Sequence, residues 1–380
     1  MNIDELLDRA VAGGVVPGIV AVVADRDGIV HEGAAGAARP DTLFRIASMT
    51  KAMTSVAALR LVERGELRLD QPVADVLPAF GDLHVLEGFD GDQPRLRPPA
   101  RPVTITHLLT HTSGLGYWFS SDELVRWHEL TGAPTILTGR RASIDTPLIH
   151  DPGERWTYGV STDWLGQIVE AVSGRSLEDQ LREHVWGPLD MPDATFFPTG
   201  EQRSRLMELA SRTPDGALGA SPFVEPEPEF ASGGGGGYAT ARDYARFQRA
   251  LLRGGELDGA RILQRETVEL MFADHLHGAP LPEVMRSAVP ELTNDVPSLP
   301  FKQGWGLGLH IVLEDIPGMR RAGTGDWAGL FNCYFWIDRN SGISAALMTQ
   351  LLPFFDARMV ETLLGFEAAV YAELGAVTAA

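Results

Sequence analysis

The chain has 380 residues, of which 44% are hydrophobic and 22% are charged, as expected for a globular protein with one large or two interleaved domains. Its 51 acidic and 32 basic residues give a net charge of −19, which disfavours nucleic acid and anionic membranes as partners. A single cysteine, Cys333, excludes a disulfide within the chain and is typical of a reducing compartment.

The first residues predict a helix rather than a targeting signal. Ile3, Leu6, Leu7 and Ala10 recur at helical spacing. The segment lacks the basic n-region and long apolar h-region of a secretory signal, and no apolar run reaches the length of a membrane span. We therefore expect a cytoplasmic protein.

The periodicity of apolar residues and the turn residues between them define the other elements. In chain order, we expect strands over 17–24 and 29–33, helices over 48–64 and 105–109, helices over 165–172 and after Ser176, a helix over 241–252, strands over 305–312, 331–337 and 343–348, and a final helix over 355–373.

Three segments are expected to be irregular. Residues 79–101 predict a long surface loop, in which Asp90-Gly-Asp92 is an ordinary polar turn rather than a calcium site. Residues 221–230, rich in Pro and Glu, predict a connector. Five glycines at 233–237 are not followed by the Lys-Ser or Lys-Thr of a P-loop, so they predict a tight turn that leads into a helix capped by Thr240.

Strands lie toward both ends of the chain, with helices between them. This order predicts an α/β domain built from residues 1–45 and 232–380, with a mainly helical domain over 46–231 inserted in it.

Ser48-Met-Thr-Lys51 is the most informative motif. A Ser and a Lys three residues apart at the start of a helix lie one turn apart on the same face. That spacing places an amine beside a weak alcohol nucleophile, which needs such a group to react. In most proteins, a serine at the start of a helix is a cap and a lysine in the first turn is solvated. A lysine buried in an apolar helix, however, is costly unless it is functional.

Further landmarks follow in order along nearly the whole chain. They are Phe44-Arg-Ile-Ala-Ser-Met-Thr-Lys51, Gly65-Glu-Leu-Arg-Leu-Asp-Gln-Pro-Val73, His107-Leu-Leu-Thr-His-Thr-Ser-Gly-Leu115, Pro152-Gly-Glu-Arg-Trp-Thr-Tyr158, Ser232-Gly-Gly with Tyr238, and Trp327-Ala-Gly329 before a strand. This series resembles the class C β-lactamase-like serine hydrolases, and most closely the family VIII carboxylesterases. The resemblance implies a β-lactamase and penicillin-binding-protein-like α/β (α+β) fold, with helices flanking an antiparallel sheet and a helical insertion, and no metal or organic cofactor.

The resemblance also implies roles for single residues. Ser48 would be the nucleophile that forms an acyl-enzyme, with Lys51 and Tyr158 moving its proton; either could be the formal base. The backbone N–H groups of Ser48 and Leu330 would form the oxyanion hole. Asp163 would order its loop rather than react.

Two departures from the β-lactamase pattern bear on the substrate. Trp327 of Trp327-Ala-Gly329 replaces the Lys of Lys-Thr-Gly, and Val160 stands where the family's Tyr-x-Asn has its Asn. Both changes imply uncharged acyl substrates and weak or absent β-lactam hydrolysis. Trp327, Gly329 and Val160 are therefore candidate substrate-binding residues, and by resemblance Tyr117 and Trp118 would line the acyl or alcohol pocket.

Other chemistries have less support. No Gly-x-Ser-x-Gly elbow and no zinc motif occurs, and His111 is better explained as a hydrogen-bonded histidine at a helix end than as a base. We expect a serine carboxylesterase acting on small esters with short acyl chains. The alternatives are an acyltransferase or an amide or β-lactam hydrolase of the same fold and, less favoured, a non-catalytic binding protein.

Overall fold

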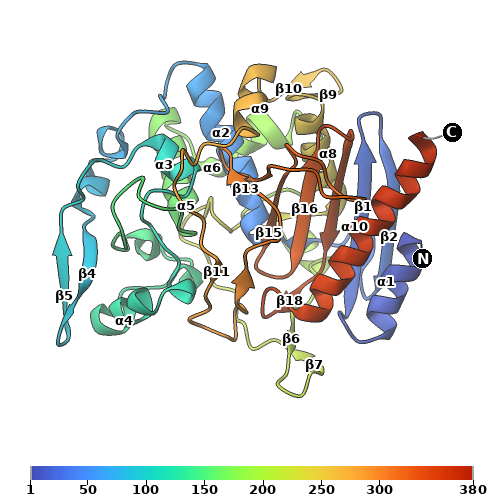
Figure 1. Cartoon of the computed structure of the whole chain (residues 1–380), viewed down its shortest axis with the longest axis horizontal. Helices are drawn as coiled ribbons and strands as arrows, with labels where there is room; N and C mark the ends of the chain where they lie inside the picture. The colour runs from blue at the N-terminus through green and yellow to red at the C-terminus, as the bar shows by residue number, and fades with distance from the viewer. Residues whose placement is uncertain (1, 379–380) are drawn as a thin grey trace.

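The computed structural model describes the backbone of residues 2–378 and the side chains of residues 2–373. Its centre is a seven-stranded sheet in which all neighbouring strands are antiparallel (Figure 1). Across the sheet the strands are β13 (Gln303–Trp305), β14 (His310–Val312), β15 (Gly325–Gly329), β16 (Cys333–Asp338), β17 (Ile343–Met348), β1 (Gly18–Asp25) and β2 (Ile29–Gly36). Strands from the first and last parts of the described chain therefore meet at the β17–β1 pair.

Ten α-helices and several short ladders surround this sheet in the described part of the chain. The helices are α1 (Ile3–Ala12), α2 (Thr50–Glu63), α3 (Ile105–Leu109), α4 (Asp122–Thr131), α5 (Ser161–Ser173), α6 (Leu177–Leu181), α7 (Gly200–Ser204), α8 (Ala241–Leu252), α9 (Arg265–Met271) and α10 (Ala357–Thr378). The short ladders pair β3 (Phe44–Arg45) with β8 (Tyr238–Ala239), β4 (Val85–Asp90) with β5 (Gln93–Arg97), β9 (Glu256–Leu257) with β10 (Ala260–Arg261), β11 (Val284–Met285) with β12 (Val296–Pro297), and β6 (Ala210–Arg212) with both β7 (Leu218–Ala220) and β18 (Leu351–Leu352).

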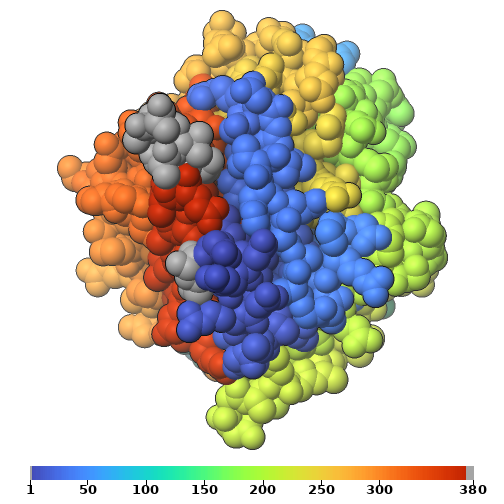
Figure 2. Space-filling view, turned by 90° about the vertical axis from the view of Figure 1, so that its right-hand side faces the viewer, coloured from blue at the N-terminus to red at the C-terminus, as the bar shows by residue number. Residues whose placement is uncertain are grey.

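The side chains of β1 are apolar on both faces of the sheet, which explains why both faces are covered. Successive side chains of a strand point to opposite faces. Val20 and Val22 pack into the core shared with α2 and α8, whereas Ile19, Ala21 and Val23 pack into a second core with α1 and α10. Figure 1 shows α10 running diagonally across the front of the sheet, and Figure 2 shows the N-terminal segment against the C-terminal helix.

The capping signals read from the sequence set the ends of three helices. Thr240 caps α8 through a hydrogen bond from the backbone N–H of Asp243, and Ser176 caps α6 in the same way through Asp179. Gly174 ends α5 in a left-handed conformation, with φ of 68°. These predictions are confirmed.

The prediction of a loop over 79–101 is wrong, because residues 85–97 form the hairpin β4–β5, of which only Val85 and Leu86 are buried. In the sequence, two residues interrupt the alternation of apolar and polar side chains that marks a strand. They are Gly88, where the register shifts, and Pro94 within β5. Asp90-Gly-Asp92 forms the turn of this hairpin. The ladder is two-stranded and its outer side chains are exposed, so it has little of the hydrophobic signal that marks a core strand.

The C-terminal strands also differ in detail from the prediction. The single strand expected over 305–312 is the hairpin β13–β14, which reverses at Gly308, where φ is 95°. Trp327-Ala-Gly329 lies inside β15 rather than before a strand, and the next strand starts at Cys333, after a left-handed Asn332. A left-handed residue ends or redirects a strand, and hydrophobicity alone does not reveal it.

The helices from the middle of the sequence lie beside the sheet. Figure 1 places α3, α4, α5 and α6 to its left, together with β4 and β5. The division into a domain of residues 1–45 and 232–380 and a helical domain of residues 46–231 stays a prediction. Among residues 2–378, no helix combines the length and apolar character that crossing a bilayer requires.

Candidate active site

Ser48 lies in a 3₁₀ turn, Ala47–Met49, that leads directly into α2. Ala47 has φ of 44°, a left-handed conformation that costs energy for any residue with a Cβ. The Thr50 hydroxyl holds this turn, since it donates to the Ala47 carbonyl at 2.6 Å and accepts the Gly237 N–H at 3.0 Å. A strained residue beside a candidate nucleophile, held by neighbouring bonds, is typical of functional sites.

Lys51 is buried one turn further along, with 1% of its surface exposed. Its Nζ lies 3.1 Å from Ser48 Oγ, 2.9 Å from Tyr117 Oη and 2.6 Å from the Gly234 carbonyl oxygen. The predicted Ser–Lys contact is therefore present, and the amine has three hydrogen-bond partners. The Gly234 carbonyl oxygen can only accept, whereas both hydroxyls can donate or accept.

Gly234 connects Lys51 to a buried carboxylate. Its N–H donates to Asp163 Oδ1 at 3.0 Å, and the same oxygen accepts from the Ser232 hydroxyl. A Cβ at Gly234 would lie 2.2 Å from Asp163 Oδ2, so glycine is required here. Burial raises the pKa of Asp163, and the Lys51 charge opposes that rise. Asp163 orders the glycine turn, as its expected role implies.

Tyr117 is both a wall of the cavity and a direct partner of Lys51. Its ring stacks on Phe119, with centroids 4.8 Å apart, and its edge meets the Tyr158 ring at 5.0 Å. Burial, with the nearby Asp163 and Tyr158, raises the pKa of Tyr117 well above its ordinary value. Tyr117 therefore stays a neutral phenol at physiological pH, a role that the sequence did not indicate.

Tyr158 contacts Lys51 through its ring rather than its hydroxyl, with Nζ 4.6 Å from the ring centroid. Its hydroxyl oxygen accepts a hydrogen bond from Trp327 Nε1 at 3.0 Å. An indole N–H can only donate, so it matches an oxygen that accepts. The structure thus brings Ser48, Lys51 and Tyr158 together, but through an arrangement that includes Trp327.

His111 packs edge-on against Trp305 beside Tyr158 and is buried. Its Nδ1 has no hydrogen-bond partner among the described residues. The prediction of a hydrogen-bonded histidine at a helix end is therefore wrong for Nδ1. Burial, and then the Lys51 charge, lower the pKa of His111 well below its ordinary value. The ring therefore remains neutral, and its main contacts are aromatic.

β15 passes directly over the turn that carries Ser48. A Cβ at Gly329 would lie 2.4 Å from the Ile46 carbonyl oxygen, so a glycine is needed for this approach. Leu330 follows at the end of the strand and lines the cavity with Ser48. Within the described residues, neither the Ser48 N–H nor the Leu330 N–H donates to another protein group, so both can bind a substrate oxygen.

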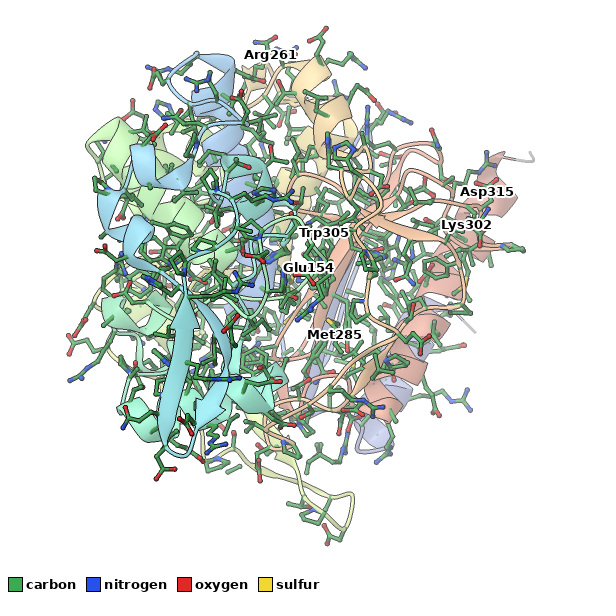
Figure 3. All side chains as sticks on the ribbon, turned by 60° about the vertical axis from the view of Figure 1, so that its left-hand side comes forward. Glu154, Arg261, Met285, Lys302, Trp305 and Asp315 are labelled. Atoms are coloured by element: carbon green, nitrogen blue, oxygen red, sulfur yellow. The ribbon has the colours of Figure 1, made fainter. Side chains whose placement is uncertain are left out.

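These residues surround a cavity of about 590 Å³ with mostly apolar walls. Figure 3 labels two of its lining residues, Trp305 of β13 and Met285 of β11, near the centre of the molecule. Of the predicted site residues, those that line it are Ser48, Tyr117, Tyr158, Trp327, Gly329 and Leu330. The volume and lining suit a small apolar ligand rather than a polymer.

Two residues expected at the substrate do not reach the cavity. Val160 is 2% exposed and packs in the main core at the start of α5, which corrects its prediction as a substrate-binding residue. Trp118 packs against Phe119 and His128 instead of lining the pocket. Their positions follow from tertiary packing, which the motif spacing does not specify.

Comparison with known proteins places the chain in a family. The family model described as Beta-lactamase matches residues 3–369. Monacolin J acid methylbutanoyltransferase of Aspergillus terreus is 34% identical over 349 residues, covering 88% of this chain and 83% of that protein. The lovastatin esterase of Penicillium rubens is 33% identical over 322 residues, covering 80% and 78%.

A solved structure agrees with these matches. The unliganded selenomethionyl simvastatin synthase of Aspergillus terreus superposes with a TM-score of 0.85 at 30% identity, covering 98% of this chain and 97% of that chain. The predicted β-lactamase and penicillin-binding-protein-like fold is confirmed. The chain belongs to the β-lactamase family of serine hydrolases and acyltransferases.

Proposed function

We propose that the chain is a serine carboxylesterase that hydrolyses small, short-acyl esters through an acyl-enzyme on Ser48. The observation that carries the proposal is the Ser48–Lys51 contact of 3.1 Å at the wall of an apolar cavity. Among the described residues, Lys51 Nζ is the one basic group that hydrogen-bonds Ser48 Oγ, and a general base must first be within such reach.

Proton transfer follows from the three partners of Lys51. In the reacting form of the enzyme Lys51 has released one proton: it then donates to Tyr117 and the Gly234 carbonyl, and it becomes the charged ammonium when it accepts the Ser48 proton as Oγ attacks the ester carbon. The N–H groups of Ser48 and Leu330 hold the oxyanion. Tyr158 then gives its phenol proton to the leaving alcohol. In the second half, the Tyr158 phenolate takes a proton from the water that attacks the acyl-enzyme, and Lys51 returns its proton to Ser48 Oγ as the acid leaves.

The site supports uncharged esters over β-lactams. Trp327 presents an indole to the cavity in the slot where β-lactamases carry a lysine. Val160 is buried in the core, so its position offers no polar group to a β-lactam amide. Both features remove contacts for a charged or amide-bearing substrate and leave apolar surface for an ester.

The test is hydrolysis of p-nitrophenyl acetate and butyrate beside a chromogenic cephalosporin. Ser48→Ala should lose most ester turnover. The matched control Ser55→Ala removes a buried hydroxyl of α2 that has no hydrogen-bond partner among the described residues, so it should keep that turnover. Wild type should open the cephalosporin slowly or not at all. Full ester turnover by Ser48→Ala would overturn the proposal.

Acyl transfer is the second candidate. Its support is the 34% identity to a protein named as a methylbutanoyltransferase and a cavity of about 590 Å³. Such a volume can hold an apolar alcohol beside the acyl-enzyme. Adding an alcohol during p-nitrophenyl butyrate turnover separates the two candidates: a transferase forms the new ester in preference to butyric acid, whereas an esterase continues to release the acid.

A further inference from the structure

A second hollow, of about 780 Å³, lies away from the catalytic cavity and shares no lining residue with it. Figure 3 labels one of its residues, Arg261, at the top of the molecule, far from Trp305 and Met285. Five of the twelve lining residues are arginines, in a chain whose net charge is −19. They are Arg26, Arg253, Arg261, Arg265 and Arg339.

The five guanidinium groups come from separate parts of the fold. Arg26 lies in the β1–β2 turn, Arg253 follows α8, Arg261 lies in β10, Arg265 begins α9 and Arg339 follows β16. The tertiary fold, and no single charged stretch of sequence, brings them to one hollow. Like charges gathered in this way repel unless a counter-charge accompanies them.

The protein supplies only part of that counter-charge. Glu256 pairs with Arg261, and Glu269 pairs with Arg339. The other three arginines have no carboxylate within 4.0 Å among the described residues. Five arginines and two glutamates leave an excess of three positive charges in the lining.

Two unpaired arginines are held in place by backbone carbonyls. Arg26 Nη2 donates to the Arg339 carbonyl oxygen at 2.6 Å, and Arg253 Nη1 donates to the Arg26 carbonyl oxygen at 2.7 Å. A guanidinium has five N–H donors, so each keeps donors for a ligand. Arg265 lies against Gly254, where a Cβ would come 3.2 Å from its Cζ.

We propose that this hollow binds a small phosphorylated anion, of the pyrophosphate class. A multiply charged phosphate neutralises the excess positive charge, and its oxygens match the paired donors of several guanidinium groups. A single carboxylate leaves most of that charge uncompensated. The site is separate from ester hydrolysis, so its ligand does not compete with the ester.

Calorimetric titration of the full chain with inorganic pyrophosphate, at low salt and at about 150 mM salt, tests this site. We expect saturable binding of one pyrophosphate, about tenfold weaker in Arg253→Gln and in Arg265→Gln, since each loses charge-assisted hydrogen bonds. The Arg265 side chain makes no hydrogen bond to the protein in the described part of the chain, so Arg265→Gln should fold normally. Arg68→Gln, exposed and outside the hollow, is the matched control and should bind as wild type does.

Absence of saturable binding, or equal affinity in the variants and wild type, overturns the proposal. Equal binding of pyrophosphate and sulfate, abolished at the higher salt, indicates general ionic attraction only and also overturns it. Binding to anionic lipid vesicles without binding of free pyrophosphate assigns the hollow to a membrane surface instead. p-Nitrophenyl butyrate turnover is followed in parallel and should be unchanged in all three variants.

Discussion

Gly329→Ala tests whether the approach of β15 to the Ser48 turn sets the geometry of catalysis. The added Cβ would lie 2.4 Å from the Ile46 carbonyl oxygen and 3.4 Å from the Ala47 Cβ. The first atom is backbone and cannot rotate away. β15 or the turn must therefore move by about 1 Å to restore ordinary contact.

The expected loss of activity is large compared with the loss of stability. A displacement of about 1 Å between reacting groups can lower the rate about 100-fold. Overpacking of this kind costs about 1–3 kcal/mol, which lowers the melting temperature of a chain this size by only several degrees. The Leu330 N–H is attached to Gly329, so the oxyanion contact moves with the strand.

Steady-state hydrolysis of p-nitrophenyl butyrate and thermal unfolding measure the two effects. Gly200→Ala is the matched control, because Gly200 begins α7 and a Cβ there meets nothing within 4 Å. It should leave both quantities near wild type. If Gly329→Ala retains kcat within about twofold of wild type, the close approach does not position the oxyanion donors and the reasoning fails.

Three further predictions follow from buried polar groups. Tyr117→Phe removes one partner of Lys51, so kcat should fall about tenfold, and an unchanged kcat would contradict the contact's role. Asp163→Ala removes the acceptor that orders Gly234, so the free energy of unfolding in urea should fall by about 3 kcal/mol; a curve superimposing on wild type refutes this. Burial raises the pKa of Asp243 to about 7, so the folded state binds its proton more tightly than the unfolded state. Stability should therefore fall as pH rises from about 4 to 7, and Asp243→Asn should flatten that slope; an equal slope in both proteins would contradict it.

The sequence predicted the fold where periodicity and caps agree. β1, the helices that begin after Thr240 and Ser176, and the helix that ends at Gly174 lie where these signals place them. It failed at the β4–β5 hairpin, where only Val85 and Leu86 are buried and the other residues of both strands are exposed or half-buried, so the hydrophobic signal is weak. It also merged β13 and β14, because the reversal depends on one backbone angle at Gly308.

For the candidate site, the sequence predicted contacts within one helical turn but not those across the fold. Ser48 and Lys51 are three residues apart, so helical geometry alone brings them together. Tyr117 and Gly234 reach Lys51 from 66 and 183 residues away, and no local pattern marks either contact. The position of Val160 in its motif predicts contact with the substrate, but Val160 is buried in the core, because tertiary packing and not motif spacing decides which residues face the cavity.

The most direct test of the account is whether Ser48 becomes acylated during turnover. Wild type and Ser48→Ala would be quenched in acid during reaction with p-nitrophenyl butyrate and examined by intact-protein and peptide mass spectrometry. We predict one butyryl group in wild type, located on the peptide that contains Ser48, and none in the variant. Steady turnover by wild type without label on Ser48, or a butyryl group on another residue that persists in Ser48→Ala, would contradict the proposed mechanism.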